Sequence, residues 1–429
     1  MPTDETFLDR PLGRRTLIRR GIAFVSTAAL MPPAFVRAVF DEASVASAAE
    51  APRRVLVILQ LGGGNDGLNT VVPYRDGAYH DARRQLGLNP ESLLHLNDEF
   101  ALHPKLTGIK ELYDQQRVAV VLGAGYPHPN RSHFRAMDIW HTGSTDERVY
   151  TGWLGRLLDA TRYEQRALWH AANVGADEPL SLKSTSSFVP SLASVPAYAL
   201  QVDPQFPRQA DRRITDWLRL YRQQAEGMAR QAEYGGQLAF VSETGLEAYE
   251  STVDLRRNAT GYQAKTEYPR TPLASALQTV AGLVVSNLGT TIAYVTTGGF
   301  DTHAGQSGTQ DRLLGVVSDA VRAFYADLDG HGLSDGVTTL GWTEFGRRVR
   351  QNGSGGTDHG TATPTFLIGG HVRGGIYGEQ PSLTRLDRNG DLQFTTDFRS
   401  IYATIISGLF GTDPADVLGA RYPVLPVFA

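Results

Sequence analysis

Residues 54–61, RVLVILQL, run directly into the glycine-rich stretch GGGNDG at residues 62–67. A short, continuous run of branched apolar residues that ends at glycines is typical of a buried parallel strand leading into a loop. Loops beyond the carboxyl ends of parallel strands are where open α/β sheets bind their ligands. This stretch therefore predicts both a fold class and the edge of the sheet at which a site would form.

The same pattern of strand and helix recurs along the chain. Strand-like runs occupy residues 117–123, 167–174, 289–297, 337–342 and 365–368, and residues with helical spacing occupy 106–116, 132–140, 272–287, 310–329 and 396–409. Thr271 followed by Pro272 is a helix start, because threonine caps the first turn and proline fits its first position. The alternation predicts an α/β fold, with a largely parallel central sheet covered by helices on both faces.

One internal segment departs from this alternation. Residues 208–255 are rich in Arg, Gln and Glu, with apolar residues at helical spacing. Such a segment predicts long amphipathic helices. We expect residues 49–429 to form a single α/β domain with a helical insert at about residues 205–260.

The N-terminal segment has the anatomy of an export signal. Arg14 and Arg15 precede a short apolar run at residues 21–31, and small residues follow at 46–48. This order predicts a twin-arginine signal over residues 1–48, export by the twin-arginine machinery, and a periplasmic or extracellular location. The apolar run is too short to cross a bilayer, and no later run approaches the roughly 20 residues needed, so no stable membrane span is expected.

Charge and cysteine content exclude several classes of function. The formal net charge is −4 and the chain contains no cysteine. A mildly acidic protein lacks the basic field of a nucleic-acid binder. Without cysteine the chain can have neither disulfides nor thiolate metal sites nor a thiol nucleophile.

Acidic and histidine side chains follow several of the predicted strands. The candidate metal ligands are Asp66, Asp301, His303, Asp358, His359 and His371, with Glu344 as a further ligand or a supporting group. Each has an ordinary explanation on its own, as a turn former, a helix cap or a solvated histidine. Together they fall where the carboxyl ends of strands should meet, and their oxygen and nitrogen atoms suit Zn²⁺, Mn²⁺ or Fe²⁺.

Hydroxyl and guanidinium groups supply candidates for catalysis. Ser132 is placed to begin a helix, where it is either a nucleophile activated by a nearby metal ion or simply a cap. Thr70 is an alternative nucleophile, and His133 is expected to point elsewhere on the helix. Arg131 and Arg347 are candidates for binding substrate oxygens, although an ion pair on the surface or in the core is the more common role for each.

These residues together resemble the DUF1501 family of exported bacterial proteins of uncharacterised function. The matching stretches are LGGGNDGLNT at 61–70, RSHF at 131–134, GGFDTH at 298–303, TEFGR at 343–347, GTDHG at 356–360 and TDFR at 396–399. That family is similar in turn to the alkaline phosphatase superfamily, which includes sulfatases. The resemblance implies a sheet-centred α/β fold with two metal ions at the strand ends.

The resemblance also implies roles for individual residues. Asp66, Asp358 and His359 would hold one metal ion, Asp301, His371 and His303 the other, and Ser132 would bridge both. The superfamily usually places its first histidine four residues after the aspartate, whereas Gly305 stands there in this chain. Ser132 is followed by His133 and Phe134, so the formylglycine chemistry of sulfatases is not expected.

Two functions of different class follow. The first is an exported, metal-dependent hydrolase that acts on a small anionic substrate, a phosphate or related ester, with Ser132 as its nucleophile. The alternative is a non-catalytic envelope or extracellular binding protein that retains the fold and pairs with an unknown envelope partner. The full set of acidic and imidazole groups favours the first, and the altered ligand spacing favours the second.

Overall fold

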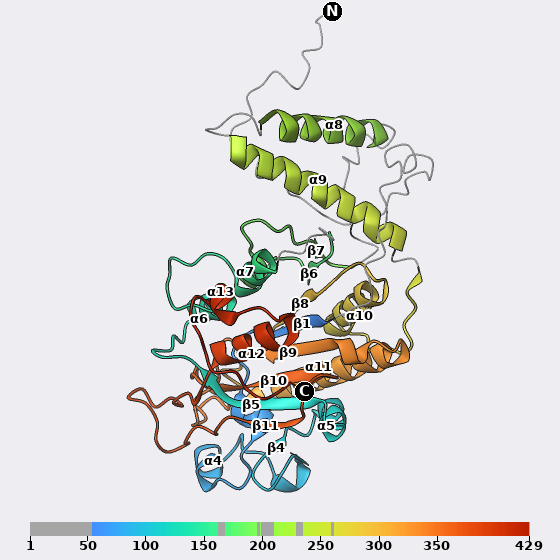
Figure 1. The fold of residues 1–429 in the computed structure, drawn as a ribbon. Helices are drawn as coiled ribbons and strands as arrows, with labels where there is room; N and C mark the ends of the chain where they lie inside the picture. Colours follow the sequence, from blue (N-terminus) through green and yellow to red (C-terminus); the bar gives the residue numbers. More distant parts are fainter. Residues whose placement is uncertain are drawn as a thin grey trace, which may run out of the picture. The chain divides into compact units, whose positions relative to one another are not determined.

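The computed structural model describes residues 54–161, 168–194, 198, 210–228, 235–258 and 261–428. The predicted signal segment, residues 1–48, lies outside the described residues. The chain divides into two compact units. One of them includes residues 195–252, with helix α8 (Ala210–Met228) and most of helix α9 (Gly235–Asn258), where the helical insert was predicted. The other contains the sheet (Figure 1).

The larger unit is built on a nine-stranded sheet in the order β11-β5-β10-β9-β1-β8-β6-β7, with β12 also paired to β5. Its strands are β1 (Val55–Leu61), β5 (Val118–Gly125), β6 (Ala171–Val174), β7 (Ser191–Leu192), β8 (Ile292–Thr297), β9 (Val337–Trp342), β10 (Thr363–Gly369), β11 (Gly375–Tyr377) and β12 (Thr396–Asp397). Every residue of β1 is buried. This strand lies between β8 and β9 and runs parallel to both, which is the environment that its unbroken apolar sequence predicts.

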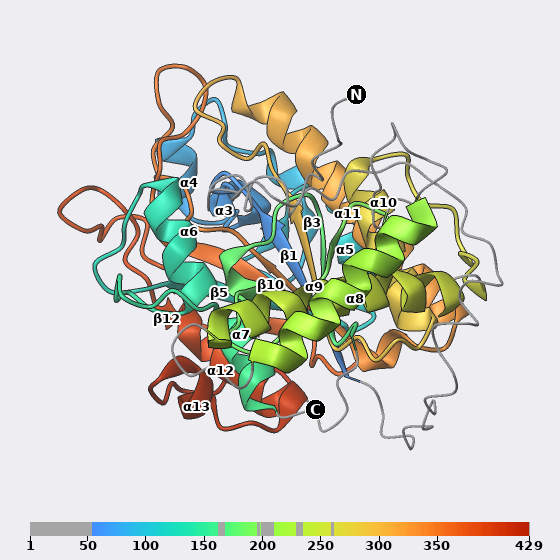
Figure 2. The same cartoon turned by 90° about the horizontal axis from the view of Figure 1, so that it is seen from above.

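Helices cover both faces of this sheet. They are α3 (Gly67–Thr70), α4 (Gly77–Ala82), α5 (Thr107–Asp114), α6 (His133–Thr142), α7 (Trp153–Ala160), α10 (Pro272–Val285), α11 (Gln306–Gly330), α12 (Phe398–Phe410) and α13 (Pro414–Leu418). Helices α7, α12 and α13 lie on one face and α10 and α11 on the other (Figure 2). The predicted α/β fold with a largely parallel sheet is confirmed. Thr271 caps α10 as predicted, since its side chain accepts a hydrogen bond from the backbone N–H of Ala274.

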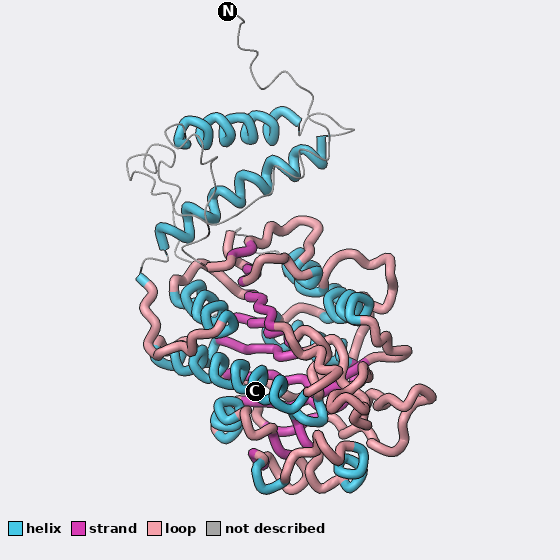
Figure 3. The backbone as a smooth tube through the Cα atoms, turned by 180° about the vertical axis from the view of Figure 1, so that it is seen from behind, coloured by secondary structure: helices cyan, strands magenta, loops and turns pink. Residues whose placement is uncertain are grey.

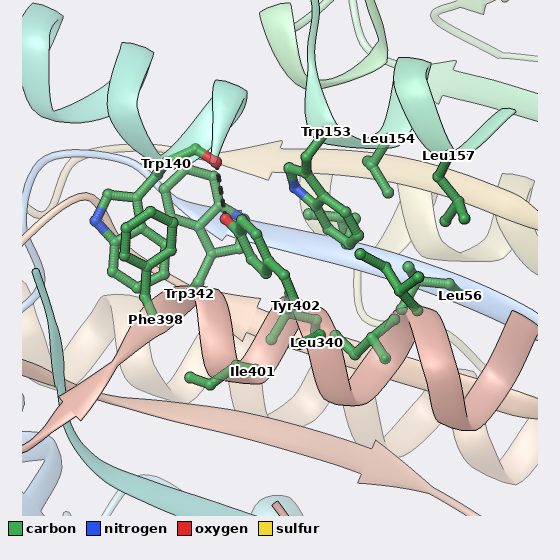
Figure 4. Close-up of a cluster of buried hydrophobic side chains, with 14 of the residues drawn as sticks. Leu56, Trp140, Trp153, Leu154, Leu157, Leu340, Trp342, Phe398, Ile401 and Tyr402 are labelled. Atoms are coloured by element: carbon green, nitrogen blue, oxygen red, sulfur yellow. Dashed lines mark hydrogen bonds between the residues drawn. The ribbon is translucent and has the colours of Figure 1, made fainter. Parts of the chain in front are cut away.

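Aromatic side chains fill the core beneath α6 and α12. The ring of Trp140 stacks on those of Trp342 and Phe398, with centroids 5.1 and 4.4 Å away, and the hydroxyl of Tyr402 donates a 2.8 Å hydrogen bond to the Trp140 carbonyl oxygen (Figure 4). Burial of these large rings, together with Leu56 and its neighbours on β1, fixes α6 against the sheet.

Strand β10 runs antiparallel to both of its neighbours, β5 and β9. Its residue Gly369 pairs with Thr338, near the start of β9, so its carboxyl end lies at the edge where the parallel strands begin. The prediction that His371 joins the other candidate ligands is therefore wrong. It assumed that β10 runs in the same direction as the strands that precede those ligands. By the same reversal, the loop that precedes β10 lies where β1, β5, β8 and β9 end.

A small second sheet, β2-β4-β3, lies outside the main one, and loops make up a large share of the larger unit (Figure 3). Its strands are β2 (Val71–Val72), β3 (Leu94–His95) and β4 (Ala101–Leu102). Among the described residues, no helix is both long enough and apolar enough to span a bilayer.

Candidate metal centre

Three histidines and one aspartate converge at the edge where the parallel strands end. His133 is the first residue of α6, just beyond β5; Asp301 and His303 follow β8; His359 lies in the loop before β10. The Nε2 atom of His359 lies 3.0 Å from that of His133 and 2.9 Å from that of His303. It also lies 3.0 Å from Asp301 Oδ1, which in turn is 3.0 Å from His303 Nε2 and 3.5 Å from His133 Nε2.

Hydrogen bonds fix which ring nitrogen of two histidines carries the proton. His133 Nδ1 lies 2.7 Å from Glu344 Oε1, and His359 Nδ1 lies 2.8 Å from the carbonyl oxygen of Arg131. Ionised carboxylate oxygens and carbonyl oxygens only accept hydrogen bonds, so both Nδ1 atoms must donate. In the neutral rings the two Nε2 atoms therefore present lone pairs to each other and to Asp301.

Such a concentration of acceptors fits a cation. For a tetrahedral Zn²⁺ with bonds of 2.0–2.1 Å, neighbouring ligand atoms lie about 3.3 Å apart, which is close to the separations seen here. Metal-bound histidines almost always donate their second ring N–H to a carboxylate or a carbonyl, as these two do. His133, Asp301 and His359 form a group whose ligand atoms all lie within 4.8 Å of one another. His303 lies against two of these three and could add a fourth ligand.

Arg347 holds the aspartate of this cluster in place. Its buried guanidinium donates to Asp301 Oδ1 at 2.7 Å and to the carbonyl oxygens of Gly63, Gly64, Phe300 and Thr357. Burial opposes ionisation of Asp301, but the hydrogen bond from the Arg347 guanidinium outweighs it, and the pKa of Asp301 is lowered to about 2. Asp301 is thus an anion at any physiological pH. The donors of Arg347 are spent within the fold, so substrate binding is not its role.

Glu344 lies behind His133 and is fully buried. Its Oε1 atom accepts hydrogen bonds from His133 Nδ1 and, at 2.8 Å, from the backbone N–H of Gly63. The adjacent Thr343 hydroxyl donates to the Leu61 carbonyl oxygen at 2.6 Å. Glu344 therefore ties the loop after β1 to the histidine of α6, which suits its predicted place as a supporting group.

Asp66 lies apart from the cluster. It is buried, and its Oδ2 forms an ion pair with the equally buried Arg83 and accepts from the Gln306 side chain. Thr70 lies beside it, donating to the Asp66 carbonyl oxygen and accepting from the Asn65 side chain, both at 2.8 Å. A guanidinium thus occupies the position beside Asp66 where the resemblance implies a metal ion.

The remaining predicted residues lie around the cluster. Asp358 is half exposed, with a carboxylate oxygen 3.5 Å from His303 Nδ1 and 3.1 Å from the Asn352 side-chain nitrogen. Its pKa is lowered, first by the Asn352 hydrogen bond and then by His303. Arg131 contributes its carbonyl oxygen to His359, while its guanidinium pairs with Asp391 at 3.1 Å.

Ser132 precedes α6 in an exposed position, and its side chain makes no capping hydrogen bond. The Ser132 hydroxyl therefore does not act as a helix cap. The residue that follows it is His133, a member of the cluster. The expectation that His133 points away was wrong: it reaches across to Glu344 at the end of β9. The signal for this was present in the sequence, since His133 follows a buried strand just as Asp301 does.

Comparisons with known proteins identify a family. The model of the family described as "Protein of unknown function (DUF1501)" matches residues 53–419. No curated protein matches the sequence.

Several solved structures of hydrolases share a low level of similarity. A sulfatase from Pseudoalteromonas sp. is 12% identical, with 84% of this chain and 68% of that chain covered and a TM-score of 0.36. The phosphonate monoester hydrolase of Agrobacterium radiobacter is 9% identical, with 86% of this chain and 78% of that chain covered and a TM-score of 0.35. The alkaline phosphatase from the Antarctic bacterium TAB5 is 10% identical, with 76% of this chain and 95% of that chain covered and a TM-score of 0.29. These values are too low to carry an argument about function.

Proposed function

The chain belongs to the DUF1501 family, and on that premise we propose that it is a metal-dependent hydrolase of phosphate or related esters that works outside the cytoplasm. One observation carries the proposal: the Nε2 atoms of His133 and His359 face each other at 3.0 Å, beside the carboxylate of Asp301, while both Nδ1 atoms are committed as donors. Without a cation this arrangement sets lone pairs against one another, and a divalent ion relieves it.

The proposed ligands are His133, Asp301 and His359, with His303 as a fourth. This differs from the two-ion arrangement that the resemblance implies, because Asp66 pairs with Arg83 and His371 lies at the opposite edge of the sheet. Imidazole nitrogens with one carboxylate favour Zn²⁺, with Mn²⁺ and Fe²⁺ as weaker candidates. When bound, the ion would act as a Lewis acid, withdrawing charge from an ester oxygen and helping a nearby hydroxyl to ionise.

Ser132 is the proposed nucleophile. Its exposed hydroxyl makes no capping bond and lies one residue from a proposed ligand. Thr70 is a poor rival, because its buried hydroxyl is committed to Asp66 and Asn65. His303 and Asp358, at the edge of the cluster, are about half exposed to solvent. A small anionic substrate could therefore reach the site from this side.

The test combines metal analysis with turnover. Protein purified without chelator should contain about one divalent ion per chain and hydrolyse at least one member of a panel of phosphate, phosphonate and sulfate esters. Ser132→Ala should keep the ion and lose turnover. Thr70→Ala should keep both the ion and turnover. Full activity in Ser132→Ala would exclude the serine mechanism, and metal-free protein with unchanged activity would exclude the metal.

A second candidate function is supported by the ion pair between Asp66 and Arg83. With one candidate ion site among the described residues, the chain could serve as a non-catalytic extracytoplasmic binding protein that retains the fold. A chain that binds one ion tightly but turns over none of the esters would support this candidate.

A further inference from the structure

A cavity of about 190 Å³ lies against the proposed metal site. Its wall includes Glu344, which accepts from His133, and Phe345, whose ring centroid lies 4.8 Å from those of both His133 and His359. Its rim includes Asn130, whose side-chain oxygen accepts a 2.8 Å hydrogen bond from the backbone N–H of Ser132. The cavity and the cluster therefore share a wall, and the rim leads directly to the proposed nucleophile.

The size of the cavity limits what it can hold. It far exceeds the roughly 10–15 Å³ needed for one water, and it is smaller than the roughly 300–1,000 Å³ of sites for drug-sized ligands. Four aromatic residues contribute to its lining: Tyr126, Trp140, Phe345 and Phe394. Flat aromatic side chains suit a single ring, which they can contact on its faces and edges.

The charged groups of the lining are of one sign. Glu344 and Asp387 contribute carboxylates, and none of the residues that line the cavity is Lys, Arg or His. A second anionic group would meet both carboxylates, and the guanidinium of Arg131, which acts on Asp387 from outside the lining, is already paired with Asp391. The occupant is therefore uncharged, in contrast to the anionic group expected at the metal cluster.

One buried donor in the lining has no partner. Trp140 is 1% exposed, and its indole nitrogen has no hydrogen-bond partner within the described part of the chain. Its ring is fixed in place by stacking on Trp342 and Phe398 (Figure 4). The indole nitrogen is itself buried, so an occupant of the cavity meets the fixed ring of Trp140 rather than its N–H.

We propose that this cavity, which we call the ring pocket (Tyr126, Trp140, Glu344, Phe345 and Phe394), binds an uncharged six-membered ring. The ring is the alcohol or phenol part of the ester whose anionic group lies at the metal cluster. This inference rests on the proposed hydrolase function and names its substrate class: small monoesters of a ring-bearing, otherwise uncharged alcohol. The carboxylates of the lining disfavour esters that carry a second anionic group.

The test measures ring binding directly, without turnover. Phenol, methyl glucopyranoside and benzoate are titrated against the full chain by ligand-observed NMR, with and without bound metal. The two neutral probes distinguish an aryl from a sugar ring, and benzoate tests the exclusion of anions. Gln393 lies exposed on the rim, so Gln393→Trp should block the entrance. Gln393→Ala is the matched control, because it loses the same bonds to the carbonyl oxygens of Arg385 and Leu386 without adding bulk.

At least one neutral probe should bind with and without metal, and benzoate at least about tenfold more weakly, which corresponds to about 1.4 kcal/mol. Gln393→Trp should weaken the neutral probe by a similar factor, while Gln393→Ala should bind it like the wild type. Absence of neutral-probe binding, or binding unchanged by Gln393→Trp, would overturn the ring pocket and leave the metal test untouched. Ring binding by a protein that takes up no metal would instead keep the pocket and reject the hydrolase.

Discussion

Replacing Glu344 by glutamine isolates the charge behind the metal site. In the wild type, Oε1 of this buried carboxylate accepts from both His133 Nδ1 and the Gly63 N–H. The glutamine amide oxygen can occupy the same position and keep both hydrogen bonds. Its nitrogen would then lie on the side of Oε2, which is 3.1 Å from the Thr343 hydroxyl oxygen, an atom able to accept. The substitution therefore removes the negative charge with little change in shape.

The expected effect follows from the place of this charge behind one proposed ligand. A carboxylate that accepts the second N–H of a metal-bound histidine raises the basicity of the ring, and its loss typically lowers metal affinity 10–100-fold. For Glu344→Gln we therefore expect Zn²⁺ affinity to fall by roughly that factor, about 1.4–2.7 kcal/mol. His133→Ala removes the ligand itself and should weaken binding further. Glu344→Ala is less informative, because it leaves two buried donors without an acceptor.

The assay is competition for Zn²⁺ against a chromophoric chelator of known affinity, with folding checked by circular dichroism. Glu111→Gln is the matched control, because it makes the same change on an exposed side chain of α5 and should leave affinity unchanged. Zn²⁺ affinity in folded Glu344→Gln equal to that of the wild type would refute the role given to Glu344. Equal affinity in His133→Ala as well would reject the site.

Three further outcomes are expected. Replacing Arg14 and Arg15 by lysine should leave the full-length precursor in the cytoplasm, as fractionation and immunoblotting would show, whereas normal export would exclude the twin-arginine route. Arg83→Met should cost about 3–5 kcal/mol in urea unfolding, because it strands the buried charge of Asp66, and adding Asp66→Asn should recover part of that loss; a single variant as stable as the wild type would show that the pair is not needed. Removing the ion with chelator should lower the Tm, and restoring Zn²⁺ at 100 times its Kd should regain about 2.7 kcal/mol, while a Tm indifferent to both would argue against a bound ion.

The fold could be read from the sequence because its signals are local. The apolar run at 55–61 needs burial on both faces, and only the centre of a sheet provides it. Likewise, Thr271 and Pro272 mark the start of α10 by local contacts. The Thr271 side chain accepts a hydrogen bond from the first turn of the helix, and Pro272 occupies the first helical position, where no N–H partner is needed. Patterns of this kind depend on neighbours in sequence, so the strands and helices that carry them could be placed within a few residues.

The site could be predicted only in part, because its geometry depends on strand direction and on partners far away in sequence. A run such as residues 363–369 is equally apolar in either direction, so nothing local shows that β10 is reversed. That reversal separates His371 from the site and brings His359 into it. The pairing of Asp66 with Arg83 could not be foreseen either, because nothing in the sequence next to Arg83 shows that this arginine is buried.

A chain without cysteine has no covalent means of tying its loops together, and the cluster offers a substitute. His133 and His359 are 226 residues apart in sequence, and Asp301 and His359 are 58 apart. An ion bound by all three would act as a removable cross-link, since the unfolded chain cannot bring these groups together without closing very long loops. Its stabilising effect would come mainly at the expense of the unfolded state, as a disulfide's does in the entropic account of cross-linking. Metal supply would then set how long the folded protein survives as well as whether it reacts.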